Sequence, residues 1–406
     1  MKKLIHSILK RFGFFKFRDY VTKKHARYFT RRNRKTIKGD GIMRVAFIVY
    51  EPGMWDKQKP VYEEMLKRED FEPFIIVAPD VSVSEETRKK KQAFFLENHK
   101  NVILYDNKTR NRFKLGEFQY TFYQTPYNYK FPKDIRPTKL VKYSKLCYIP
   151  YAYIGAEDFV EVSSQDNFFC NVYFGFMDSE PMQKILYNNF YKTCKYGYQN
   201  FEFLGYPAFE SYLNLTVKDK IENILWLPRW SYAEKGGGSH FLEYKDNYNQ
   251  LAINHSNLNW SIRPHTLMFT SLASLGLFSC TKEQEYRKNL SNAKVYLDEH
   301  SLLNETLACT DLVIADYSSI IVMYFLSGRP IIYCDGNLKL SGVYEQLYDA
   351  MYIAKSWDDV KELTEKLLNG IDPLRDKRNK ISAQIADKHK NSAKKIVDRI
   401  CEDYRN

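Results

Sequence analysis

The sequence offers little support for a fold stabilised by disulfides or zinc. Its 406 residues include seven cysteines, and none of them forms a Cys-x-x-Cys pair. A disulfide framework or a zinc knuckle is therefore not expected. Cys309 and Cys334 lie in apolar segments, and we predict that both are buried as small hydrophobic side chains.

Long apolar runs and the common nucleotide-binding loops are also missing. No segment approaches the roughly 18 apolar residues of a membrane-spanning helix. The first residues lack the apolar core and the small-residue cleavage site of a signal peptide. Neither Gly-x-x-x-x-Gly-Lys nor Gly-x-Gly-x-x-Gly occurs, so ATP hydrolysis and dinucleotide redox chemistry lose their usual support.

The net charge of +13 is concentrated at the front of the chain. Residues 1–40 contain fourteen Lys and Arg against two Asp, which leaves a net charge of only +1 for the rest. Apolar side chains are interleaved with these cations; they are Leu4, Ile5, Ile8, Leu9, Phe12, Phe14, Phe15 and Phe17. This pattern predicts an interfacial helix that binds an anionic membrane through residues 1–38. A disordered basic tail is the alternative, and we expect no nucleic-acid partner.

After residue 40, short apolar runs alternate with polar helical stretches, which is typical of parallel sheets covered by helices. Thirteen strand candidates fall into two series, seven before residue 206 and six after residue 221. We predict an α/β fold with two Rossmann-like domains facing a central cleft, where ligands usually bind. The expected divisions are the basic segment 1–40, domains 41–215 and 216–372, and a C-terminal helix, 373–406, that packs back on the first domain.

Asp311–Ser319 joins an apolar strand directly to two hydroxyl residues and an apolar helix. Ser318 and Ser319 stand where that helix is expected to begin, so free backbone N–H groups would face a ligand phosphate. Asp316 is predicted to hold the turn or a ribose hydroxyl. In the simpler alternative Ser318 is only an N-cap, and the two roles are compatible.

Two further strand ends carry residues suited to phosphate chemistry. Arg263 and His265 flank Pro264, where a fixed guanidinium suits phosphate oxygens and an imidazole can exchange a proton. His265 as a simple helix cap is the alternative. The glycine run that ends at Gly238 allows close backbone approach, and Arg229 and His240 could each reach a phosphate from this loop; a flexible surface connection is the alternative.

Together these segments resemble the CDP-glycerol glycerophosphotransferase family, which makes teichoic-acid and capsule polymers of Gram-positive surfaces. The resemblance covers roughly residues 222 to 336. It rests on Ile224-Leu225-Trp226-Leu227-Pro228-Arg229, on Arg263-Pro264-His265, and on Asp311–Ser319 with Arg329-Pro330.

This resemblance implies a GT-B architecture with an acceptor-binding first domain and a donor-binding second domain. It also implies a CDP-activated polyol donor, a polymer or lipid-linked acceptor, no essential metal or cofactor, and a peripheral enzyme on the cytoplasmic face of the membrane. Carried over by position, Arg263 and His265 would contact the donor pyrophosphate, and Ser318 and Ser319 would hold the donor phosphate or ribose. The chain could also form a homo-oligomer.

One motif departs from the family pattern. Many members carry a histidine in a Trp-His-Gly segment of the first domain, whereas Cys147–Tyr153 has none. Tyr151 or Tyr153 could position the acceptor, His240 could replace the missing group, or Glu157 and Asp158 could supply a base.

The predicted function is transfer of a polyol phosphate to a hydroxyl of a surface polymer or lipid-linked primer. One alternative is a GT-B glycosyltransferase that uses a nucleotide sugar. The other is a catalytically silent scaffold that binds nucleotide or membrane.

Overall fold

The computed structural model describes residues 14–80, 83–153, 166–213, 215, 220–232, 238–300, 303–336, 338, 340 and 343–406. The chain divides into two compact units. The first comprises Met1–Ala152, Glu161–Ala208 and Asn391–Asn406, and the second comprises Tyr153–Val160 and Phe209–Lys390. None of the described helices has the length and apolar character needed to cross a bilayer.

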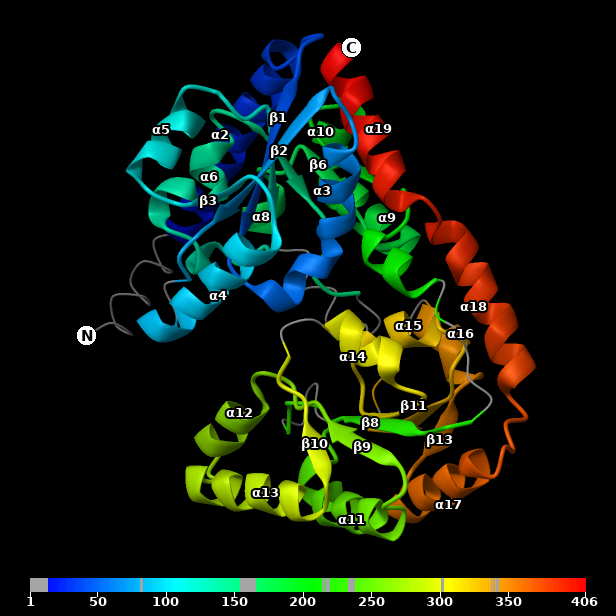
Figure 1. The fold of residues 1–406 in the computed structure, drawn as a ribbon. Coiled ribbons are helices and arrows are strands. Elements are labelled where there is room, and N and C mark those ends of the chain that lie inside the picture. Colours follow the sequence, from blue (N-terminus) through cyan, green and yellow to red (C-terminus); the bar gives the residue numbers. More distant parts are fainter. Residues whose placement is uncertain are drawn as a thin grey trace. The chain divides into compact units, whose positions relative to one another are not determined.

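A seven-stranded parallel sheet forms the centre of the first unit, with strand order β3-β2-β1-β4-β5-β6-β7 (Figure 1). Its strands are β1 (Met43–Val49), β2 (Phe71–Val77), β3 (Val102–Leu104), β4 (Tyr120–Tyr123), β5 (Lys145–Tyr148), β6 (Phe174–Phe176) and β7 (Asn200–Glu202). Nearly every residue of β1, β4 and β5 is buried. These strands are apolar without alternation because helices cover both faces of the sheet.

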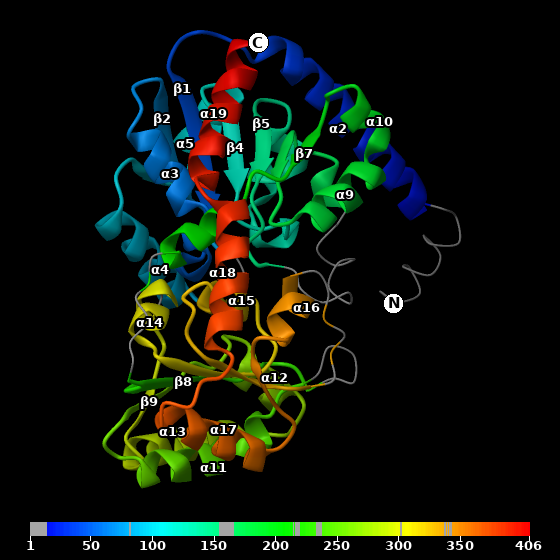
Figure 2. The same cartoon turned by 90° about the vertical axis from the view of Figure 1, so that its right-hand side faces the viewer.

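The helices of this unit are α2 (Phe14–Thr36), α3 (Lys59–Leu66), α4 (Glu85–Asn98), α5 (Asn107–Lys114), α6 (Pro137–Leu140), α8 (Asp166–Phe169), α9 (Glu180–Asn189), α10 (Tyr191–Lys195) and α19 (Ser392–Arg405). Short 3-10 helices occupy Pro52–Lys57, Asn128–Lys130 and Lys133–Ile135, and the division between the two units falls within a further 3-10 helix, Pro207–Tyr212. Helix α19 lies beside α3 although most of the chain separates them (Figure 2).

A buried charge cluster fixes α19 to the sheet. The Lys145 ammonium lies 2.6 Å from Asp403 Oδ2, and the hydroxyls of Tyr120 and Tyr173 each donate to the same carboxylate at 2.7 Å. The Lys145 side chain is fully buried. Burial lowers the pKa of Lys145, and the charge of Asp403 opposes that shift.

The second unit contains a six-stranded parallel sheet with strand order β10-β9-β8-β11-β12-β13. Its strands are β8 (Asn223–Leu227), β9 (Asn259–Ile262), β10 (Val295–Leu297), β11 (Leu312–Ala315), β12 (Ile331–Cys334) and β13 (Tyr352–Ala354). One aromatic-rich core includes Trp226, Phe241, Tyr248, Trp260 and Tyr286.

Helices cover both faces of this sheet (Figure 1). On one face lie α11 (Phe241–Asn254), α12 (Met268–Ser274), α13 (Cys280–Asn292) and α17 (Trp357–Leu368), and on the other lie α14 (Leu303–Cys309), α15 (Ile320–Phe325) and α16 (Val343–Tyr348). Helix α18 (Arg375–His389) packs on this unit, where Arg378 donates to the carbonyl of Gly328 and Ser382 to that of Leu326.

The fold differs from the sequence expectations in the C-terminal tail and at Cys309. Residues 373–406 form two helices rather than one, because the chain takes a left-handed conformation at Asn391 (φ 55°) between α18 and α19. Cys334 is buried as predicted, but the prediction for Cys309 was wrong, since its side chain is exposed. Cys309 is the last residue of α14, and its place on the helix faces solvent rather than the sheet.

Candidate functional site

The candidate site lies at the carboxyl ends of β8 and β11, where the strand order of the second sheet reverses. From β8 the chain continues to β9 and β10 on one side, whereas β11 leads to β12 and β13 on the other. Ligands of open parallel sheets bind at such reversal points, because the two loops leave in opposite directions and open a crevice. Arg229 follows β8, and Asp316 follows β11.

Asp316 joins these two strand ends. Its side chain is completely buried, and its Oδ2 accepts hydrogen bonds from the backbone N–H groups of Arg229 (2.8 Å) and His240 (3.2 Å). Its Oδ1 lies 2.7 Å from Nδ1 of His240. Asp316 thus holds the turn, which is one of its two predicted roles. It also orients the imidazole of His240.

The environment of His240 favours the imidazolium. Burial opposes the charged ring, but the hydrogen bond and charge of Asp316, with smaller contributions from Glu243 and Asp335, outweigh it and raise the pKa of His240 above its ordinary value. The ring also stacks on Tyr244, with centroids 4.9 Å apart. Because Nδ1 faces Asp316, Nε2 is the nitrogen left for a ligand.

Arg229 contributes a buried positive charge to the same loop. Its guanidinium donates to the carbonyl of Tyr317 at 3.1 Å and lies 5.0 Å from the centre of the Tyr317 ring. Burial lowers the pKa of Arg229, and this is partly offset by Tyr317 and Asp316. Ser239 donates to the backbone carbonyl of Arg229 at 2.6 Å, which further fixes the loop.

Sequence reasoning missed a close contact between two glycines. Gly238 has φ +88°, and a Cβ added to it would lie 3.2 Å from Cα of Gly336. A Cβ on Gly336 would lie only 2.5 Å from Cα of Gly238. Gly336 follows β12 after Asp335, just as Asp316 follows β11, so the same strand-end rule could have found this pair. Gly236 and Gly237 lie outside the described residues.

Ser318 and Ser319 sit at the start of α15, which is only six residues long. Ser318 Oγ accepts from the N–H of Ile320 at 3.3 Å, and the carbonyl of Ser318 accepts from Tyr344 Oη at 2.9 Å. The N-cap is Ser319 rather than Ser318, and its side chain makes no capping hydrogen bond. The short helix provides a weaker dipole than the sequence suggested, since fewer peptide units are aligned.

Arg263 and His265 follow β9, the strand next to β8. The Arg263 guanidinium is bound within the protein, to Asp298 at 2.7 Å and to the carbonyl of His300 at 2.8 Å. This differs from the projecting side chain expected from the sequence. The expectation was wrong because the parallel pairing of β9 with β10 brings Asp298, which follows β10, next to Arg263, and no local pattern indicates that pairing.

His265 has an exposed side chain, and its ring lies 6.0 Å from that of Trp230. Nδ1 accepts the N–H of Leu267 at 3.2 Å, so the neutral ring carries its proton on Nε2. Desolvation by surrounding protein and the charge of Arg229 lower the pKa of His265 to about 4, although the side chain still contacts solvent. The surroundings therefore raise the pKa of His240 and lower the pKa of His265.

Tyr151, which was predicted to position the acceptor, lies in the first unit. Tyr151 Oη lies 2.5 Å from Tyr127 Oη, and burial, followed by the proximity of Tyr127, raises the pKa of Tyr151 well above its ordinary value. A phenol of this kind is a poor base near neutral pH. Glu157 and Asp158 lie outside the described residues.

Comparison with known families decides the assignment of the second unit. Residues 207–402 match the family model of CDP-Glycerol:Poly(glycerophosphate) glycerophosphotransferase. The second unit carries the domain of this family. The match spans 196 of the 406 residues and includes Phe209–Lys390. The resemblance seen in the motifs is thereby confirmed over the second unit, which has the sequence of a glycerophosphotransferase-family enzyme.

Solved structures agree on the fold. The wall teichoic acid polymerase TagF is 13% identical, with 96% of this chain and 97% of that chain covered and a TM-score of 0.55. The UDP-GlcNAc 2-epimerase from Neisseria meningitidis is 12% identical, with coverages of 89% and 100% and a TM-score of 0.54. A second UDP-N-acetylglucosamine 2-epimerase is 11% identical, with coverages of 90% and 97% and a TM-score of 0.59. No curated protein sequence matches the chain. The chain thus has a GT-B-like fold.

Proposed function

We propose that this protein transfers a polyol phosphate, either glycerol phosphate or ribitol phosphate, from a CDP donor to a hydroxyl of a surface polymer or lipid-linked primer. The observation that carries the proposal is the Asp316 cluster, which brings Arg229 and His240 together at the strand reversal of the unit that matches the family. The CDP donor is further supported by TagF crystals soaked with CDPG. The enzyme would work at the cytoplasmic face of the cell membrane, without a cofactor.

In the proposed reaction an acceptor hydroxyl oxygen attacks the donor β-phosphorus. A new P–O bond forms while the bond from that phosphorus to the bridging oxygen breaks, and CMP leaves with the bridging oxygen. The hydroxyl proton passes to solvent or to a base of the first domain. Positive charge and N–H donors lower the barrier because negative charge spreads over the phosphate oxygens in the transition state.

The two histidines have different proposed roles. His240, held by Asp316 and favoured as imidazolium, supplies a cationic N–H donor to the pyrophosphate. His265 is neutral near pH 7 and supplies Nε2–H as an uncharged donor. Arg229 adds a fixed positive charge, and Ser318 with Ser319 faces the donor phosphate or ribose. Opposed pKa shifts within one crevice are typical of groups that divide the handling of charge.

Arg263 is proposed to hold the ends of two strands together rather than to contact the donor directly. Its bonds to Asp298 and to the carbonyl of His300 tie the ends of β9 and β10 together. This tie fixes the corner that carries His265. The role replaces the direct pyrophosphate contact that the family resemblance suggested.

A donor screen tests the function. The protein is incubated with CDP-glycerol, CDP-ribitol and UDP-sugars, each with and without acceptor, and the released nucleotide is identified. We expect CMP from a CDP-polyol. Release of UDP alone would instead support a nucleotide-sugar glycosyltransferase. This alternative is compatible with the fold, which the chain shares with UDP-GlcNAc 2-epimerase. If no donor turns over with any acceptor, the result would favour the alternative of a catalytically silent scaffold.

A further inference from the structure

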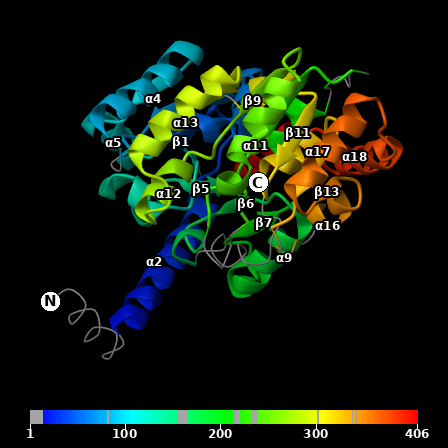
Figure 3. The ribbon, with the colours of Figure 1, turned by 90° about the horizontal axis from the view of Figure 1, so that it is seen from below.

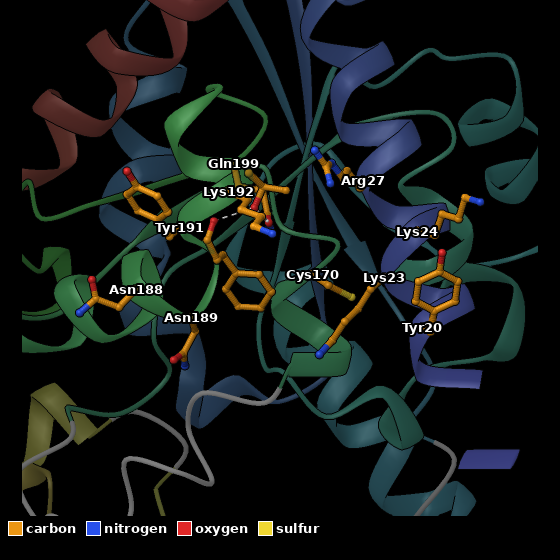
Figure 4. Close-up of a pocket in the computed structure, with 12 residues that line it drawn as sticks. Tyr20, Lys23, Lys24, Arg27, Cys170, Asn188, Asn189, Tyr191, Lys192 and Gln199 are labelled. Carbon is orange, nitrogen blue, oxygen red and sulfur yellow. Dashed lines mark hydrogen bonds between the residues drawn. The ribbon is translucent and has the colours of Figure 1, made fainter. Parts of the chain in front are cut away.

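A pocket of about 600 Å³ lies in the first unit, between α2 and the α9–α10 segment (Figure 4). Its lining includes Lys23, Lys24 and Arg27 from α2 and Lys192 from α10. This volume falls within the usual range of small-ligand sites. The pocket belongs to one compact unit and is separate from the Asp316 cluster, which lies in the second.

The lining carries a strong positive charge. Four of the residues that line the pocket are Lys or Arg, and none is Asp or Glu. Asp19 forms an ion pair with Lys23 at 3.2 Å. Within the described part of the chain, no carboxylate forms an ion pair with Arg27 or Lys192. Such a cluster favours an anion with several oxygens, and phosphate is the best match for guanidinium and ammonium donors together.

Exposed aromatic side chains surround the cations. Tyr20 is 61% exposed and Tyr191 is 48% exposed, and both line the pocket. Phe17 and Tyr28 on α2 are 65% and 63% exposed. The first turns of α2 extend away from the sheet in Figure 3. Aromatic rings beside cations are characteristic of surfaces at the membrane interface, where the ring reaches the headgroup layer.

The pocket walls are held in place by the fold. Ala26, Thr30 and Asn33 are buried along one stripe of α2, and Asn33 donates to the carbonyls of Val141 and Ser144 at 2.8 and 3.0 Å. On the opposite wall, Gln199 is buried and donates to two backbone carbonyls, at 2.7 and 2.8 Å. It also accepts from Thr193 Oγ1 at 2.7 Å. The cations therefore project from two fixed walls.

We infer that this pocket binds the phosphate headgroup of an anionic phospholipid and so docks the first unit on the membrane surface. The inference goes beyond the attachment predicted for residues 1–38, because it assigns half of the site to α9 and α10. It does not depend on the proposed transfer reaction. A soluble phosphate or polymer would need the cations but would not need the exposed rings beside them.

Charge-matched double variants test the site. Arg27→Ala with Lys192→Ala removes one pocket cation from each wall. Lys35→Ala with Lys184→Ala removes the same charge from exposed positions of α2 and α9 that do not line the pocket. Binding is measured by sedimentation with phosphatidylcholine vesicles, with and without phosphatidylglycerol. Circular dichroism and thermal unfolding verify that each variant folds.

We expect the pocket variant to lose about 20-fold or more in affinity for the phosphatidylglycerol vesicles, since each cation near an anionic surface contributes about a fivefold effect. The matched control should stay near wild type. Equal losses in the two variants would overturn the inference, because they would show diffuse attraction without a pocket. An unchanged pocket variant would overturn it as well.

A second arm separates a lipid from a soluble anion. Inorganic phosphate and soluble poly(glycerol phosphate) are titrated into the protein without vesicles. Weak binding of both, with no difference between wild type and the pocket variant, supports the lipid site. Binding as tight as that to vesicles, lost in the pocket variant, would instead make this a soluble-anion site. Neither arm contains a CDP donor, so the outcome is independent of the proposed reaction.

Discussion

His240 Nδ1 lies 2.7 Å from Asp316 Oδ1, and the same carboxylate accepts the backbone N–H of Arg229. A single buried side chain thus sets the orientation of an imidazole and fixes the loop after the neighbouring strand. The proposed mechanism depends on this pair, because a raised imidazole pKa near a pyrophosphate supplies positive charge where the reaction generates negative charge.

The first prediction concerns Asp316→Asn. The amide can still accept the backbone hydrogen bonds, but it would donate to Nδ1 and remove the charge that favours imidazolium. We expect kcat to fall about 10- to 100-fold, and the alkaline limb of the pH–rate profile to move to lower pH. His240→Gln should lose this limb altogether. An unchanged alkaline limb in Asp316→Asn would contradict the role of the pair.

The same pair should leave a signature in stability. The folded-state pKa of His240 is raised, so its contribution is fully present below its ordinary pKa of about 6.5 and is lost as pH rises through the raised folded value. The unfolding free energy of the wild type should therefore exceed that of His240→Gln by more at about pH 6 than at about pH 9. Urea unfolding at the two pH values measures this difference. A difference that grows with pH would contradict it.

The second prediction concerns His265. His265→Ala should lower kcat about 10²- to 10³-fold, as expected for loss of a hydrogen-bond donor to a transferring group. His265→Gln keeps an N–H donor and should restore part of the loss. Because the pKa of His265 is about 4, no activity change near pH 6 should depend on this residue. Donor affinity, measured by calorimetry, separates a binding role from a catalytic one.

The third prediction concerns the glycine contact. In Gly336→Ala the added Cβ would clash with Cα of Gly238, so the loop that carries His240 must move. We expect a loss of donor binding or turnover of at least about 10-fold, since misplacement by about 1 Å is costly at such sites. Gly41→Ala is the control, because a Cβ there has no neighbour within 4 Å. Equal activity in the two variants would argue against a tight loop.

The fourth prediction concerns Arg263 and Asp298. If Arg263 acts as a structural tie, then Arg263→Ala and Asp298→Ala should both lower stability and turnover, and the double variant should be little worse than Asp298→Ala alone. Asp298 also accepts from Thr306 at 2.7 Å, so its loss is expected to be slightly larger. Thermal unfolding and turnover are measured together. A turnover defect in Arg263→Ala alone, without loss of stability, would favour direct contact with the donor.

The fifth prediction concerns α19. Asp403→Ala leaves Lys145 buried without its charged partner and removes the acceptor of two tyrosine hydroxyls. Breaking a buried ion pair from one side costs about 3 to 5 kcal/mol of unfolding free energy. Asp387→Ala, on an exposed position of α18, should change it by less than about 0.5 kcal/mol. Denaturant unfolding distinguishes the two.

The α/β class, the thirteen strands and the family were available from the sequence alone. Strands buried on both faces are continuous apolar runs, and their signal is local. The motifs at Asp311–Ser319 and Arg263–His265 are local too, since residues after a parallel strand necessarily gather at one edge of the sheet.

The tertiary structure decided which other groups of the protein those residues contact. Asp298 and Arg263 are 35 positions apart, Gly238 and Gly336 are further apart still, and no local pattern encodes which side chains meet. The same holds for the pocket between α2 and α10, and for the division of the tail at Asn391. Sequence determined which chemistry was present at the strand ends, whereas long-range packing decided which groups were held by the protein and which imidazole has a raised pKa.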